Sequence, residues 1–172
     1  MKKKIFLILA NLSIILIVMV NLGFNIFFLA TKPLSASGIF NDCKFSIVEL
    51  RAESESVGIS YGTAEIISND GTMITNAHIV TYTQLGEIFS FEKFSVRFVD
   101  EENFREVELI KYNTDLDIAV LKLIDINRKI TPIKIGDDSV LNSGDDVYAI
   151  GNLSNYGLSI SKGVVAIPHI NV

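Results

Sequence analysis

Two histidines, His78 and His169, are the only side chains of this chain that exchange protons near neutral pH without a perturbed pKa. His78 follows a short apolar run that is typical of a strand. Taken alone, a histidine there is more often a packed or surface residue than a catalyst. Asp117 opens the apolar run 118–124, and a carboxylate at the mouth of a buried strand needs a polar partner such as an imidazole N–H. His78 and Asp117 are therefore candidates for an interacting pair.

A second pattern contains a serine. Gly58-Ile59-Ser60-Tyr61-Gly62 fits the G-x-S-x-G motif of α/β-hydrolases, and Ser60, Asp117 and His169 follow that family's chain order. The motif requires a strand, a sharp turn and a helix, whereas Ser60 precedes another predicted strand and a hairpin. We therefore disfavour an esterase site. The two histidines and the carboxylates lack metal-ligand spacing, so we expect no metal and no cofactor.

The elements that would position these residues are short strands. Apolar runs recur between turn signals, and Asn69-Asp70-Gly71 between two of them is typical of a hairpin. One helical turn is expected after His78, around 79–85. The pattern predicts an all-β barrel or sandwich. The predicted strands are Phe45–Leu50, Gly62–Ile67, Met73–Thr75, Phe94–Phe98, Val107–Leu109, Ile118–Ile124, Val147–Ile150 and Leu158–Ile167.

The amino terminus differs from the rest. Lys2, Lys3 and Lys4 precede an apolar stretch over 5–30, which is long enough for a membrane-spanning helix and longer than the apolar core of a cleaved signal. We expect a single-pass anchor with a cytoplasmic amino terminus and an extracytoplasmic domain, or a secreted domain if the segment is cleaved. Beyond the three lysines the chain has 12 basic and 20 acidic residues, which argues against nucleic-acid binding. Cys43 is the only cysteine, so a disulfide scaffold is excluded, and its thiol is either free or paired between chains.

Several segments, taken in order, resemble the trypsin-like serine proteases, specifically their HtrA branch. Each segment alone is weak evidence for the family. Together they are strong evidence, because the segments follow the family's order along residues 57–166. Residue 79 is Ile rather than Cys, which points away from the disulfide-rich digestive enzymes. The matching segments are Gly62–Gly71, Thr75-Asn76-Ala77-His78-Ile79-Val80, Asp117-Ile118-Ala119-Val120-Leu121-Lys122, Ile135–Ser139, Gly144-Asp145, Ala149-Ile150-Gly151-Asn152 and Ser161–Val165.

This resemblance implies a fold and roles for two residues. His78 would be the general base, and Asp117 would fix its tautomer and stabilise the imidazolium; Asp115 is the rival carboxylate. The fold would be all-β, with a trypsin-like first six-stranded barrel and an incomplete second barrel, preceded by one transmembrane helix. The sequence departs from the family at Ala64, Glu65, Asp146 and Leu153.

The family's nucleophile motif, G-N-S-G-G, does not occur in the 172 residues. Ser154, Ser159 and Ser161 are interpreted as loop and strand-surface residues rather than substitutes. We therefore expect a bacterial serine endopeptidase truncated before its serine, and inactive as this chain. The expected parts are a basic tail (1–4), an anchor (5–30), a linker (31–44), a first barrel (45–131) and the start of a second barrel (132–172).

The resemblance also suggests partners. Family members cleave misfolded proteins, so unfolded or misfolded protein or peptide substrates are expected, and an oligomer and a following PDZ domain remain open. The alternative function is a non-catalytic, degenerate protease module that binds peptide or protein at the cell surface, because a triad without its serine forms no acyl-enzyme.

Overall fold

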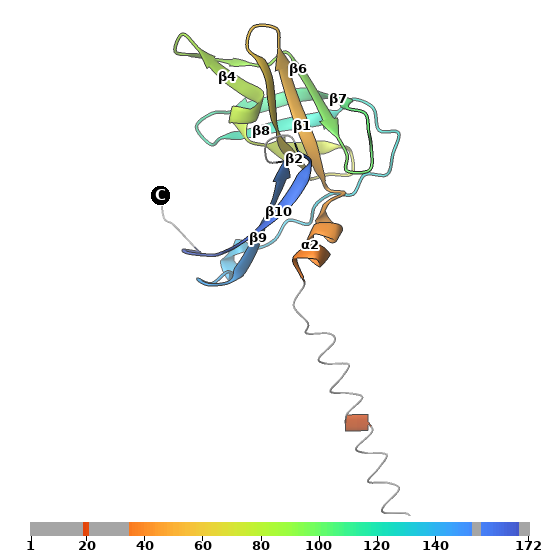
Figure 1. The fold of residues 1–172 in the computed structure, drawn as a ribbon. Helices are drawn as coiled ribbons and strands as arrows, with labels where there is room; N and C mark the ends of the chain where they lie inside the picture. Colours follow the sequence, from red (N-terminus) through yellow and green to blue (C-terminus); the bar gives the residue numbers. More distant parts are fainter. Residues whose placement is uncertain (1–18, 21–34, 153–155, 169–172) are drawn as a thin grey trace, which may run out of the picture. The chain divides into compact units, whose positions relative to one another are not determined.

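The computed structural model describes residues 19–20, 35–152 and 156–168 (Figure 1). The chain divides between residues 35 and 36 into two units, and the second contains all the strands named below. The predicted anchor over 5–30 lies almost entirely outside the described residues. Within the described ranges, no helix has the length and apolar character needed to cross a membrane.

A closed six-stranded barrel forms the centre of this unit, in the order β1-β2-β3-β8-β7-β6. It closes because β1 pairs antiparallel with both β2 and β6. This confirms the predicted all-β fold with a six-stranded first barrel. The strands are β1 Ile47–Ser54, β2 Gly58–Ile66, β3 Thr72–Thr75, β6 Lys93–Arg97, β7 Arg105–Asn113 and β8 Ile118–Leu123.

The turn between β2 and β3 forms where Asn69-Asp70-Gly71 predicts it. Gly71 has φ +75°, and a Cβ there would lie 2.9 Å from the Leu123 side chain, so the position requires glycine. Asp70 Oδ1 accepts hydrogen bonds from the Thr72 N–H at 3.1 Å and from Thr72 Oγ1 at 2.7 Å. The ion pair with Lys122 contributes most to holding the pKa of Asp70 well below its usual range, and the two bonds from Thr72 add to it.

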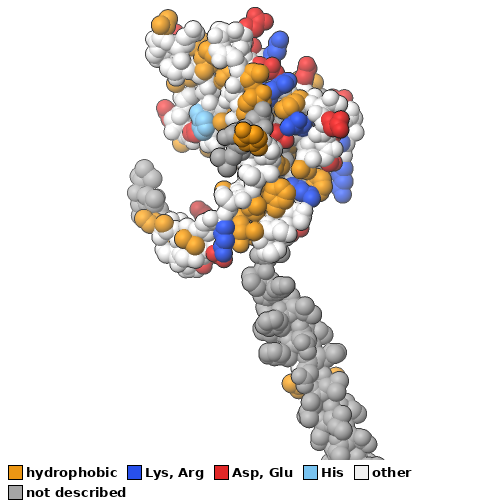
Figure 2. All heavy atoms as spheres, viewed as in Figure 1, with side chains coloured by type: hydrophobic (Ala, Val, Ile, Leu, Met, Phe, Trp, Pro, Cys, Tyr) orange, Lys and Arg blue, Asp and Glu red, His pale blue; other side chains and the backbone are white. Residues whose placement is uncertain are grey.

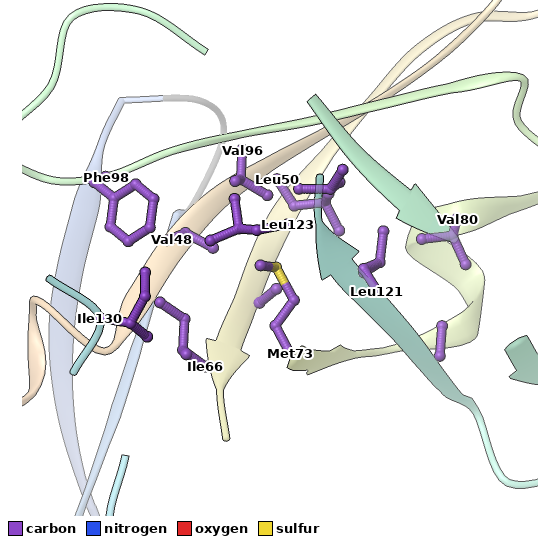
Figure 3. Packing of buried hydrophobic residues seen from close by; sticks show 13 residues of the cluster. Val48, Leu50, Ile66, Met73, Val80, Val96, Phe98, Leu121, Leu123 and Ile130 are labelled. Atoms are coloured by element: carbon purple, nitrogen blue, oxygen red, sulfur yellow. The ribbon is translucent and has the colours of Figure 1, made fainter. Parts of the chain in front are cut away.

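Alternate side chains of the strands point into the barrel and form its core (Figure 3). The alternation puts one apolar set inside, as expected for strands with one buried face. Leu50, Met73, Val96 and Leu121 are fully buried there. Phe98, directly after β6, and Ile130, in the segment after β8, also belong to the cluster.

Replacing Leu50 by Ala should destabilise the domain by about 3–5 kcal/mol, because it leaves a cavity among side chains that cannot close around it. Leu116→Ala is the matched control, since Leu116 is 68% exposed and its loss should cost no more than about 0.5 kcal/mol. Chemical denaturation of both variants measures the difference between their free energies of unfolding. Equal denaturation midpoints for the two variants would contradict the placement of Leu50 in the core.

The structure corrects the helical turn predicted over 79–85. The helix α3 is shorter and earlier, Ala77–Val80, and a hairpin of β4 (Thr81–Gln84) and β5 (Glu87–Ser90) follows it. The residues of β4 include β-branched and aromatic types, which favour extended backbone. Leu85 and Gly86, both with positive φ, form its two-residue turn.

The predicted linker spans 31–44. Its last part contains the helix α2, Ala36–Cys43. Ala36, Ile39, Phe40 and Cys43 are half-buried and recur at helical spacing, while Asn41 and Asp42 are exposed. Two helical turns are too few for this periodicity to stand out in the sequence.

The strands β9 (Asp146–Asn152) and β10 (Leu158–Val164) form a separate two-stranded antiparallel ribbon. A short 3-10 helix, Asp138–Val140, precedes it. The ribbon contacts the barrel through Asn152, whose Nδ2 donates to Glu49 Oε2 at 2.8 Å, and Arg97 donates to the same buried carboxylate. A second barrel over 132–172 stays a prediction.

Candidate active site

Two neighbouring strand ends place His78 beside Asp117. β3 pairs with β8 so that Thr75, the last residue of β3, lies opposite Ala119. α3 therefore begins next to the residue that precedes β8. Thr75 is buried and its Oγ1 donates to the Thr63 carbonyl at 2.6 Å, which fixes the end of β3 against β2.

His78 Nδ1 lies 2.8 Å from Asp117 Oδ2. The His78 backbone N–H also donates to Asp117 Oδ1 at 2.9 Å. The imidazole is two-thirds exposed, with a side-chain exposure of 66% against 44% for the carboxylate. Figure 2 shows the imidazole, in pale blue, at the surface of the domain. The structure thus brings together the two residues that the sequence singles out.

Hydrogen bonds hold the pKa of Asp117 below its usual value. The largest contribution comes from the His78 backbone N–H, followed by the His78 ring, and Asn76 contributes less. An ionised carboxylate only accepts hydrogen bonds, so the neutral imidazole carries its proton on Nδ1. Nε2 then has a free lone pair. A pair with this geometry can act as a general base with an orienting acid.

A cavity of about 290 Å³ adjoins this pair. His78, Asp117 and Thr114 line one part, and Tyr82 and Ile88 of the β4–β5 hairpin line another. The hairpin that the sequence does not predict is thus an element of the site. Its signal in the sequence is Gly86 between two short runs of strand-forming residues.

The other candidate residues lie elsewhere. Asp115 is exposed, and the ring bonds to Asp117 instead. Ser60 lies inside β2, paired with Ala52, and no helix follows it, so the G-x-S-x-G pattern is not a nucleophile elbow. His169 and Ser154 lie outside the described residues.

Two serines of the ribbon belong to its strand surface. Ser159 donates to the Gly151 carbonyl at 3.0 Å, and Ser161 is exposed on β10 opposite Ala149. Throughout the described ranges, no group of three or more His, Cys, Asp or Glu side chains could hold a metal ion.

Three of the four departures from the family pattern lie within the described residues. Ala64 is fully buried in the barrel core. Glu65 is half-buried on β2, and burial raises the pKa of its carboxyl. Asp146 forms an ion pair with Lys162 across the ribbon at 2.8 Å. Leu153 lies outside the described residues.

Comparison with known families gives the class of protein. The model of the trypsin-like peptidase domain matches residues 62–169. The chain belongs to this family, and the curated relatives that it resembles are DegP-like proteases. The resemblance seen in the sequence is thereby confirmed.

The relatives are named as periplasmic proteases. Probable periplasmic DegP-like serine endoproteases match with 30% identity in Brucella suis and 32% in Bartonella henselae, over 108 residues, or 63% of this chain. The match in Pseudomonas putida strain F1 has 29% identity over 116 residues, or 67% of this chain. The matches cover 19%, 20% and 22% of those proteins, respectively, so the chain spans about a fifth of their length.

A solved structure shows the same fold. The HtrA-type protease AlgW with a tripeptide superimposes with a TM-score of 0.65 at 22% identity. The likeness covers 77% of this chain and 40% of the other.

Proposed function

We propose that this domain supplies the base and the orienting acid of an HtrA-type serine endopeptidase. His78 is the general base and Asp117 orients it. The observation that carries the proposal is the 2.8 Å contact between His78 Nδ1 and Asp117 Oδ2, at positions that match the family's two motifs.

The chemistry follows from the free Nε2. It takes the proton of a serine hydroxyl as that oxygen attacks a peptide carbonyl, and later gives the proton to the leaving amine. The Asp117 carboxylate keeps the proton on Nδ1 and stabilises the imidazolium that forms between these steps. A low pKa suits this role, because the carboxylate stays ionised throughout.

The substrates are proposed to be unfolded or misfolded proteins and peptides. The AlgW structure contains a tripeptide, and the DegP-like relatives are named as periplasmic, which supports an extracytoplasmic site of action. We also propose that 5–30 anchors the chain in the cell membrane, with the basic residues 2–4 on the cytoplasmic side. The organisation into a first barrel (45–131) and a second-barrel segment (132–172) is part of the same proposal.

In this proposal the nucleophile comes from outside these 172 residues, because they do not include the family's serine motif. We therefore expect residues 1–172 alone to hydrolyse no peptide bond. The second candidate function, a non-catalytic module that binds peptide or protein at the cell surface, fits the same absence of the motif.

One experiment separates the two functions. The coding DNA directly downstream of Val172 is read, and the product is expressed through any serine motif found there; this product is called the extended protein. The endopeptidase proposal expects the extended protein to cleave fluorescently labelled unfolded casein, and the 172-residue chain to leave it intact. A missing motif, or an extended protein that binds casein without cutting it, would favour the binding module.

A further inference from the structure

The side chain of Asn76 contacts Asp117 twice. Asn76 lies between β3 and α3, and its Nδ2 donates to Asp117 Oδ2 at 3.0 Å and to the Asp117 carbonyl oxygen at 3.2 Å. One amide group therefore holds both the side chain and the main chain of the same residue. The sequence motif includes this asparagine, but its spacing gives no role to it.

Asp117 has a backbone conformation that needs such support. Its φ is +51°, in the left-handed region that residues with a Cβ adopt at a cost in free energy. Such a conformation persists where surrounding contacts fix it. The Asp117 N–H reaches the Thr114 carbonyl only at 3.4 Å, so the bond from Asn76 to the Asp117 carbonyl is the shorter of these two main-chain contacts.

Packing restrains the pair only weakly, because the imidazole is 66% exposed and the carboxylate 44% exposed. Hydrogen bonds must therefore set its geometry. Asp117 Oδ1 accepts the His78 backbone N–H, and Oδ2 accepts both the ring N–H and the Asn76 amide. Among the described residues, Asn76 is the one side chain besides the ring that donates to this carboxylate.

We infer that Asn76 is a positioning residue for the His78–Asp117 pair. Its amide fixes the carboxylate and the left-handed backbone of Asp117 in the orientation that accepts the ring Nδ1–H. The inference rests on the proposed function, because only a general base needs Nε2 to be free. It adds a third residue to the machinery, one that acts through Asp117 without touching substrate.

The test reads the tautomer of His78 directly, in the full 172-residue chain held in detergent micelles. The chain has two histidines, so ¹⁵N-histidine labelling gives two rings, and His169→Gln assigns them. Long-range ¹H–¹⁵N spectra distinguish Nδ1–H from Nε2–H. We expect Nδ1–H to dominate in the unaltered protein. Asn76→Leu, of similar volume but without donors, should shift the ratio toward Nε2–H by about fivefold, the effect of one modest hydrogen bond.

A carboxyl titration gives a second readout. With ¹³C-labelled aspartate, the pKa of Asp117 should be higher in Asn76→Leu than in the unaltered protein, since one donor to the charged form is lost. Asn76→Ala serves as a second variant and should act in the same direction. Asn69→Leu is the matched control, because Asn69 is exposed in the β2–β3 turn, and it should change neither readout.

An unchanged tautomer ratio in both Asn76 variants would overturn the inference, even if their thermal stability fell, because a purely structural role moves stability alone. The readout is independent of hydrolysis. An extended protein that fails to cut casein would contradict the proposed function, while the response of the tautomer to Asn76 would still stand.

Discussion

In the extended protein, His78→Ala is expected to lower kcat for peptide hydrolysis by about 10⁶, the scale seen when a serine protease loses its general base. The physical reason is that the serine hydroxyl keeps its proton when no Nε2 lies within reach to accept it. The substitution removes an exposed side chain, so the fold should be unaffected. The ratio of the two kcat values is measured with a chromogenic peptide. The variant used must unfold at the same temperature as the unaltered protein.

His169→Gln is the matched control for this variant and should leave kcat unchanged. Undiminished turnover in His78→Ala would remove His78 from the mechanism. A large loss in His169→Gln would instead point to a base that the structure does not describe.

Asp117→Asn should lower kcat by about 10⁴. The amide can present its N–H₂ to the ring, and the neutral imidazole then carries its proton on Nε2, where it cannot accept the serine proton. The charge that stabilises the imidazolium is also lost. We expect KM to change little, because the carboxylate bonds to His78 and Asn76 rather than to substrate.

Asp115→Asn is the control, since this carboxylate is exposed and only two residues away in the sequence. It should retain activity within about twofold, which is roughly the factor that a surface change worth about 0.5 kcal/mol produces. Comparable losses in both variants would indicate a general effect of negative charge rather than a specific contact with Asp117. The two variants together separate the family's aspartate from its rival.

The barrel strands could be predicted because their signals are local. Alternation in Phe94–Phe98 and the Asn69-Asp70-Gly71 turn define elements within a few residues, and the structure has β6 and the β2–β3 hairpin there. Two sequence motifs predict that His78 pairs with Asp117, but they do not predict the geometry of the pair. Register supplies that geometry, since Thr75 lies opposite Ala119 across β3 and β8.

The β4–β5 hairpin could not be recognised in the same way. Its residues Thr81–Gln84 are mostly polar, and neither β4 nor β5 contains a buried residue, so no buried apolar face marks them in the sequence. The contact of Asn76 with Asp117 also leaves no local signal in the sequence. It spans 41 residues in the chain and depends on the left-handed backbone of Asp117, which local propensity does not predict.

The central claim is that His78 activates a serine supplied beyond these 172 residues. A fluorescent, serine-reactive phosphonate tests it most directly, because the reagent bonds only to an activated serine oxygen. The account predicts specific labelling of the extended protein, loss of labelling in His78→Ala, and no adduct on the 172-residue chain. Labelling of the extended protein that persists in His78→Ala, or a specific adduct on the 172-residue chain, would contradict it.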